Sequence, residues 1–206
     1  MAAVTKQQPR SPRARLFVAL DLPGATREGL VAWGKEALAD PALRPVAPES
    51  LHVTLAFLGS RPEEEIEGIA AAARESAAPA PWVELRDPEQ RPPRGRARLY
   101  ALPVISPGAE ALQAGLEEKL VDGGFYKPEK RSFWPHVTVA RVRFEARGSR
   151  RPAVVSEPPG AIPEELKEPR ISVRMTLYRS VLLPSGAQYV PLAQVELPGG
   201  GSSEVI

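Results

Sequence analysis

The sequence has 206 residues, of which 43% are hydrophobic and 25% are charged, and its formal net charge is +2. This balance is typical of a soluble globular domain and lacks the extended basic tracts of a non-specific nucleic-acid binder. The absence of cysteine excludes disulfides, thiol catalysis and cysteine-ligated zinc. No apolar run approaches the roughly 20 residues of a membrane span. We therefore expect a cytoplasmic protein.

The two ends of the chain differ in composition from the part between them. Residues 1–15 are polar, with several Pro and Arg, and lack the apolar core of a signal peptide. We expect them to form a disordered arm. Residues 198–206 contain a Gly-Gly-Gly-Ser-Ser run and are expected to form a flexible tail. Residues 16–197 then remain as a single domain.

Hydrophobic periodicity and turn signals predict the elements of this domain in chain order. In the first half we expect strand 16–20, helix 26–38, strand 51–58, helix 62–78 and strand 82–86. In the second half we expect strand 98–105, helix 109–121 and strand 137–144, then strands 171–183 and 188–197 joined by a turn at 184–186. Residues 147–168, rich in Pro, Gly and charge, are predicted to form a long surface loop with one helical turn.

One arrangement occurs twice along the chain. A strand, a helix and a loop lead to a second strand that opens with His-Val-Thr, and this order is repeated at nearly equal length. From Leu20 to His52 is 32 positions, and from Leu102 to His136 is 34. Two similar units that each bury one apolar face usually pack with approximate twofold symmetry. We therefore expect equivalent residues of the two units to meet in one cleft.

The two repeated tripeptides contain the chain's only histidines. Side chains two positions apart on a strand share a face, so His52 lies beside Thr54, and His136 beside Thr138. Imidazole titrates near neutrality, so one histidine of a pair can act as base while the other acts as acid. Threonine hydroxyls and the guanidinium of Arg141 are suited to holding a phosphate. Such a set can open a cyclic phosphodiester without a metal.

The two motifs and their surroundings resemble the paired HxTx motifs of the two-histidine phosphoesterases. Bacterial and archaeal RNA 2′,3′-cyclic phosphodiesterases, also described as 2′–5′ RNA ligases, are the most similar branch. The resemblance runs from about residue 16 to residue 197. It rests on the blocks Arg15–Leu20, Leu51–Gly59, Pro135–Arg141 and Tyr178–Ser180, with Gly186 and Tyr189. The second motif ends in Val139 where the family often has Leu, a harmless change on a strand.

This resemblance implies a fold, a reaction and a set of roles. The fold would be α+β and bilobal, with two pseudo-symmetric lobes whose antiparallel sheets line a central cleft and whose helices lie outside. His52 would be the proton donor to the 3′ oxygen, and His136 would be the proton acceptor that activates water. Thr54, Thr138 and Arg141 would bind the phosphate, and the product would be a 2′-phosphate. The sequence itself leaves open which histidine is acid and which is base.

Four aromatic residues near the motifs are candidates for stacking on an RNA base: Phe17, Phe57, Phe133 and Trp134. Core packing is the favoured interpretation for Phe57, because simple alternation along 51–58 places it on the face of Leu51, Val53 and Leu55. His52 and Thr54 would then lie on the opposite face. Phe133 and Trp134 are predicted to lie in a loop beside the site, where stacking and packing are equally favoured.

The expected partner is an RNA or oligonucleotide with a 2′,3′-cyclic phosphate end, tRNA fragments included. We expect no cofactor, no metal and a monomer. The same residues would also permit weak 2′–5′ ligation of RNA ends without ATP. Two alternatives stay open at this stage. One is a related enzyme that acts on other RNA ends or on small cyclic nucleotides, and the other is an RNA-end-binding module without turnover.

Overall fold

The computed structural model describes residues 11–183 and 186–199. Within this part of the chain ten strands form a sheet in the order β10-β9-β1-β3-β7-β6-β4-β8, with β2 paired to β7 and β5 paired to β6. The strands are β1 (Arg13–Asp21), β2 (Leu43–Pro45), β3 (His52–Pro62), β4 (Trp82–Leu85), β5 (Glu89–Arg91), β6 (Leu99–Ile105), β7 (His136–Val142), β8 (Arg170–Ile171), β9 (Arg174–Leu183) and β10 (Gly186–Glu196). Every pair is antiparallel, so the α+β prediction is confirmed.

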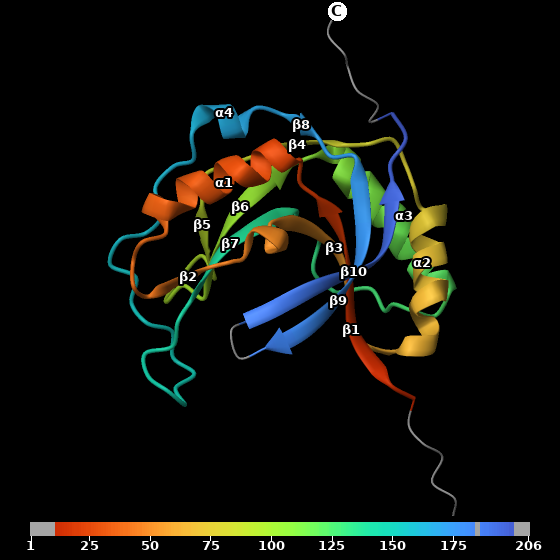
Figure 1. Cartoon of the computed structure of the whole chain (residues 1–206), viewed down its shortest axis with the longest axis horizontal. Helices are drawn as coiled ribbons and strands as arrows, with labels where there is room; N and C mark the ends of the chain where they lie inside the picture. The colour runs from red at the N-terminus through yellow and green to blue at the C-terminus, as the bar shows by residue number, and fades with distance from the viewer. Residues whose placement is uncertain (1–10, 184–185, 200–206) are drawn as a thin grey trace, which may run out of the picture.

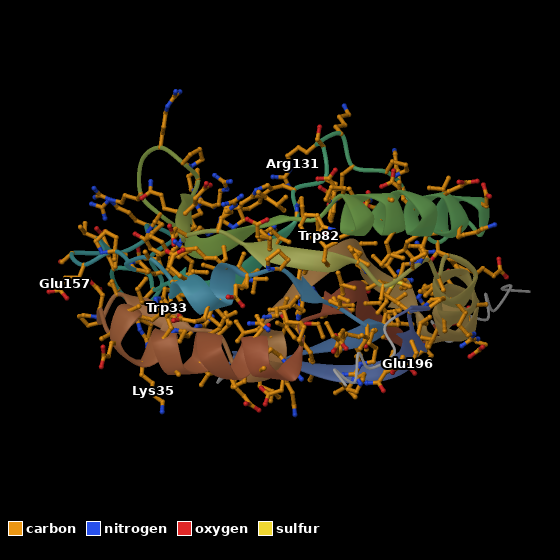
Figure 2. All side chains as sticks on the ribbon, turned by 90° about the horizontal axis from the view of Figure 1, so that it is seen from above. Trp33, Lys35, Trp82, Arg131, Glu157 and Glu196 are labelled. Atoms are coloured by element: carbon orange, nitrogen blue, oxygen red, sulfur yellow. The ribbon has the colours of Figure 1, made fainter. Side chains whose placement is uncertain are left out.

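The helices pack on the outside of the strands. They are α1 (Gly24–Ala37), α2 (Ile66–Glu75), α3 (Pro107–Asp122) and α4 (Glu164–Lys167), with short 3₁₀ turns at Pro48–Ser50 and Glu63–Glu65. Helices α2 and α3 contact each other at one end of the molecule, and α1 lies with α4 at the other (Figure 1). Figure 2 shows α1 and α3 on opposite sides of the strands that run between them. None of the helices in the described residues is long and apolar enough to cross a membrane.

Helix α3 illustrates how local sequence sets an element. The hydroxyl of Ser106 caps its first turn by accepting a hydrogen bond from the Ala109 backbone N–H at 3.1 Å. Pro107 follows at the first helical position, where its missing N–H costs nothing. Leucines spaced by four then bury one face: Leu112, Leu116 and Leu120. The helix therefore begins two residues earlier than its apolar spacing predicts.

The two halves of the sheet meet at a single residue pair. Strand β3 pairs with β7 only through Val53 and Val137, and both side chains are fully buried. On the far side of β7, Leu102 of β6 pairs with Val137 and is also fully buried. Each of the two valines directly follows a histidine of the repeated motif. This junction therefore fixes where both histidines lie.

Several predicted boundaries are wrong. Residues 13–15 belong to β1 and not to a disordered arm, because Arg13 and Arg15 pair with β3. The helix expected over 62–78 begins at Ile66, since β3 extends to Pro62. The strand expected over 171–183 is divided into β8 and β9. The rest of the predicted arm, residues 1–10, the turn residues 184–185 and residues 200–206 of the predicted tail lie outside the described residues.

Replacing Leu102 tests the packing at the junction. We expect Leu102→Ala to lower the free energy of unfolding by about 2–5 kcal/mol, because the lost side chain leaves a cavity in the hydrophobic core. The exposed Val154 serves as a control, and Val154→Ala should change stability by less than about 0.5 kcal/mol. Urea denaturation of the three proteins measures both values. Equal stability of Leu102→Ala and the parent would contradict this packing.

Candidate active site

Both histidines line one cavity of about 330 Å³ between the two halves of the sheet. Strand β3 contributes His52 and Thr54, and β7 contributes His136, Thr138 and Arg141. The wall is completed by the β2 region and by β10, through Arg44, Pro45, Val46, Ala47, Ser50, Ala187 and Tyr189. We call this space the inner cavity. Its volume lies at the lower end of the range for small-ligand sites.

A β-bulge in each central strand determines which side chains reach the site. In β3, Ala19 pairs with Thr54 and Val18 with Ala56, so Leu55 is the extra residue. In β7, Ala101 pairs with Thr138 and Tyr100 with Ala140, so the extra residue is Val139. An extra residue reverses the alternation of faces beyond it. The residue five positions after each histidine therefore returns to the histidine's side.

These bulges place Arg141 on the wall of the inner cavity and move Phe57 out of the core. The sequence prediction that Phe57 packs in the core is wrong, since its side chain is 42% exposed and lines a neighbouring cavity that also contains His52 and Thr54. Phe57 and Arg141 occupy equivalent positions of the repeated unit. The first unit presents an aromatic ring where the second presents a cation.

His136 has a defined tautomer. Its Nδ1 lies 2.8 Å from the carbonyl oxygen of Trp134, and a carbonyl can only accept, so Nδ1 carries the proton. The Nε2 atom of the neutral ring is then free to accept a proton. The Trp134 ring stacks on the imidazole at 4.1 Å between centroids, and the Arg91 guanidinium lies 3.7 Å from the Trp134 centroid. Burial, with smaller contributions from the charges of Arg91 and Arg141, lowers the pKa of His136.

His52 lies in an aromatic setting and is only 8% exposed. Its ring stacks on Phe17 at 5.1 Å and on Tyr178 at 5.9 Å, and it meets the edge of Tyr189 at 5.5 Å. Burial lowers the pKa of His52 to about 4, because the charged ring is poorly solvated. The charge of Asp21 and the backbone of Glu49 act in the opposite direction. The Nδ1 atom is buried and has no partner with hydrogen-bond geometry among the described residues.

Asp21 is a buried carboxylate that pairs with His52 across strands β1 and β3. It accepts hydrogen bonds at 2.8 Å from Arg174 Nε, Thr176 Oγ1 and Tyr178 OH. Burial, followed by the bond to Asp21, raises the pKa of Tyr178 to about 12, so the phenol remains a donor. Asp21 therefore presents a fixed negative charge near His52. No local sequence pattern indicates this role of Asp21, because its partners lie about 150 residues further along the chain.

The cavity wall carries positive charge. Arg44 of β2 pairs with Arg141 of β7, and both line the inner cavity. The short strand β2 is positioned by Asp40, whose carboxylate accepts from the backbone N–H groups of Ala42, Ser156 and Glu157. These hydrogen bonds lower the pKa of Asp40. Arg44 was missed because a three-residue strand in a proline-containing loop has no readable periodicity.

The four aromatic candidates have different surroundings. Phe17 is 3% exposed and stacks between neighbours of β3 and β9, with Tyr178 at 5.2 Å. Phe133 packs against the core. Trp134 contacts His136 directly, and Phe57 alone of the four is exposed in a cavity that His52 also lines. Among the residues that the structure describes, no group of three or more His, Cys, Asp or Glu side chains is placed to hold a metal ion.

This pairing of two HxT motifs across one cavity matches a known family. The model of the LigT-like phosphoesterases matches residues 20–87. An RNA 2′,3′-cyclic phosphodiesterase of Thermus thermophilus is 34% identical over 193 residues, which cover 90% of this chain and 91% of the relative. The chain belongs to the LigT-like, two-histidine phosphoesterase family. A second family member, the RNA 2′,3′-cyclic phosphodiesterase of Escherichia coli, is 31% identical over 86% of this chain and 93% of its own length.

Solved structures of LigT-like phosphoesterases share this fold. A crystal structure of a Thermus thermophilus protein superposes with a TM-score of 0.70 at 31% identity and covers 91% of this chain and 100% of its own. Escherichia coli LigT complexed with 3′-AMP gives a TM-score of 0.67 at 29% identity over 91% of this chain and 99% of LigT. Escherichia coli LigT complexed with phosphate gives 0.66 at 28% identity, with the same coverage of the two chains.

The buried setting of His52 predicts an unusual titration. Because burial disfavours the charged ring, we expect His52 to titrate with a midpoint near pH 4 and to be neutral at pH 6. With only two histidines in the chain, ¹⁵N-correlated NMR of the imidazoles assigns both by comparing single-histidine variants. A midpoint of 6.5 or higher for His52 in the ligand-free protein would contradict the burial argument.

Replacing Asp21 should lower the pKa of His52 further. Asp21→Asn removes the negative charge that favours the imidazolium, while keeping the size of the side chain. Thr176→Val is the matched control, because it removes one hydrogen bond to Asp21 and leaves the charge in place. The same imidazole titration should show a lower midpoint for Asp21→Asn than for Thr176→Val. Identical midpoints would mean that the carboxylate does not act on the ring.

Proposed function

We propose that this protein is an RNA 2′,3′-cyclic phosphodiesterase that opens cyclic phosphate ends by acid–base catalysis between its two histidines. The observation that carries the proposal is that His52 and His136 line one cavity but lie near side chains of opposite charge, Asp21 for His52 and two arginines for His136. The family relatives with this printed activity, and LigT structures in complex with 3′-AMP and with phosphate, support it. A small cavity rich in phosphate-binding groups fits a cyclic nucleotide end.

His136 acts as the general base. Its Nδ1–H is held by the Trp134 carbonyl, so Nε2 is the atom that takes a proton from water. The nearby charges of Arg91 and Arg141 favour the neutral ring, which is the form a base requires. Stacking on Trp134 at an interplanar angle of 14° restricts rotation of the ring.

His52 acts as the general acid. In the ligand-free protein its pKa of about 4 keeps it neutral at pH 7. A bound phosphate adds a negative charge beside the ring and raises its pKa, in the same direction as the charge of Asp21. The proton is then available where the leaving oxygen develops charge. Substrate binding therefore raises the pKa of His52 and increases the fraction of the ring that is protonated.

The remaining polar side chains of the cavity hold the phosphate. Thr54 and Thr138 lie two residues after the histidines and present hydroxyl donors to the non-bridging oxygens. Arg141 supplies a fixed cation and a planar pair of N–H donors. Arg44, its neighbour across β2 and β7, adds a second positive charge. Negative charge that builds up on the phosphoryl oxygens is therefore stabilised from both halves of the sheet.

These roles define a balanced reaction. Water loses a proton to His136 and its oxygen forms a bond to phosphorus, while the bond from phosphorus to the 3′ oxygen breaks. His52 gives its proton to that oxygen, and the product is a 2′-phosphomonoester with a free 3′-hydroxyl. The same step, with an RNA 5′-hydroxyl in place of water as the nucleophile, forms a 2′–5′ linkage and a free 3′-hydroxyl without ATP. It requires a high concentration of ends, because water competes.

Hydrolysis of an oligonucleotide ending in a 2′,3′-cyclic phosphate, in the presence of EDTA, tests this function. We expect metal-independent formation of the 2′-phosphate, and a loss of kcat by a factor of about 10² to 10⁴ in both His52→Ala and His136→Ala. Circular dichroism confirms that the variants are folded. RNA binding without turnover by the folded parent protein would contradict the enzyme proposal and favour an RNA-end-binding module.

A substrate with sulfur in place of the 3′ oxygen tests the division of roles. A thiolate leaves without being protonated, so His52→Ala should lose much less activity on this substrate than on the oxygen substrate. His136→Ala should lose about the same factor on both, because activation of water is still needed. The opposite pattern would exchange the roles of the two histidines.

A further inference from the structure

A second, larger cavity opens beside the inner one. Its volume is about 580 Å³, and it shares a wall with the inner cavity that is formed by Arg44, His52, Thr54, Arg141, Ala187 and Tyr189. Its outer wall is formed by Arg15, Phe17, Phe57, Ser180, Leu182 and Leu183. We call it the outer cavity. Because the two cavities share this wall, a ligand bound in the inner cavity can extend into the outer one.

The outer cavity is suited to an anion. Of its described lining residues three are arginines, Arg15, Arg44 and Arg141, and none is acidic. Arg44 and Arg141 belong to both cavities, so positive charge continues from one to the other. A phosphate chain that follows this path meets favourable potential along its length.

The outer wall also carries an exposed platform. The Phe57 ring is 42% exposed, and the Arg15 guanidinium lies over it at 4.9 Å from the centroid. Leu182, which is 71% exposed, lines the same cavity from β9. Aromatic faces and guanidinium planes are the surfaces on which unpaired bases stack in single-stranded RNA complexes. The bulge at Leu55 is what turns Phe57 towards this space.

We propose that the outer cavity binds the nucleotide that precedes the cyclic end of an RNA chain. Its base stacks on the platform of Arg15 and Phe57, and the phosphate that links it to the terminal nucleotide lies along the positively charged wall that the two cavities share. The inner cavity of about 330 Å³ holds the terminal ribose with its cyclic phosphate. This inference rests on the proposed phosphodiesterase function and deepens it, because it makes an oligonucleotide a better substrate than a cyclic mononucleotide.

The test compares kcat/KM for adenosine 2′,3′-cyclic phosphate with that for a diadenosine dinucleotide ending in the same cyclic phosphate. For the parent protein we expect the dinucleotide to be preferred by about ten- to hundredfold, the range that stacking of one base provides. Phe57→Ala should reduce this ratio to within a few-fold of one. Phe57→Tyr, which keeps an aromatic face, should retain it.

Two controls separate stacking from other effects. Phe144→Ala removes another exposed phenylalanine, which pairs with Pro152 outside both cavities, and should leave the ratio as in the parent. A dinucleotide with an abasic first ribose retains the linking phosphate but offers no base. The ratio of its kcat/KM to that of the cyclic mononucleotide should be unchanged by Phe57→Ala.

The outcomes distinguish this inference from the proposed function. No turnover of either substrate by folded protein would overturn both. Turnover of the two substrates with equal efficiency would leave the function in place and overturn the second-nucleotide site. An equal loss on both substrates in Phe57→Ala would mean that the platform holds the terminal base, which also overturns it.

Discussion

The pairing of Val53 with Val137 joins the two halves of the sheet, and the geometry of the site depends on it. Each valine directly follows a histidine, and the strands are antiparallel, so one backbone contact brings the two histidines to the same cavity. Because side chains alternate along a strand, a slip of one residue would turn a histidine away from the cavity and expose a buried valine. Full burial of both valines opposes such a slip.

The bulges after the two threonines determine which later side chains of β3 and β7 face the cavities. Each bulge reverses the alternation of faces, so the residue five positions after the histidine returns to the same side. At this position the two halves of the molecule differ, with Phe57 in one and Arg141 in the other. In the proposed function, the second unit therefore binds phosphate at the position where the first unit offers a ring to a base.

The two histidines differ for a similar reason. His136 donates from Nδ1 to the Trp134 carbonyl and lies near two arginines, which favours a neutral ring with a free Nε2. His52 is buried among aromatic rings and lies near the carboxylate of Asp21, which favours the charge that desolvation opposes. The surroundings of His136 favour the form that accepts a proton, and the charge near His52 favours the form that donates one. The asymmetry that the proposed acid–base pair needs therefore comes from neighbouring residues and not from the motifs themselves.

The repeated sequence pattern predicted the features of the site that the two units share. The two His-Val-Thr motifs at similar spacing were sufficient to expect that the histidines meet, and family resemblance added the α+β fold. Arg141 was chosen for its proximity to the second motif, although regular alternation would have placed it on the other face. The same rule failed for Phe57, because no residue in 51–58 signals a bulge.

The site residues that could not be predicted from the sequence are positioned by contacts between distant segments of the chain. Asp21 acquires its role from hydrogen bonds with β9, and Arg44 from a three-residue pairing with β7. In both cases the function of a side chain depends on strand pairing across more than 90 positions of the chain. Periodicity within one segment carries no information about such partners.

The pH dependence of kcat/KM for a 2′,3′-cyclic phosphate substrate tests the central claim most directly, namely that two histidines with lowered pKa values share the acid and base roles. The account predicts a bell-shaped profile whose maximum lies below pH 6.5, because burial lowers the pKa of both rings in the free enzyme. It also predicts that the basic limb of the kcat profile lies at higher pH, since bound phosphate raises the pKa of His52. A kcat/KM that rises continuously from pH 4 to pH 8 would contradict it.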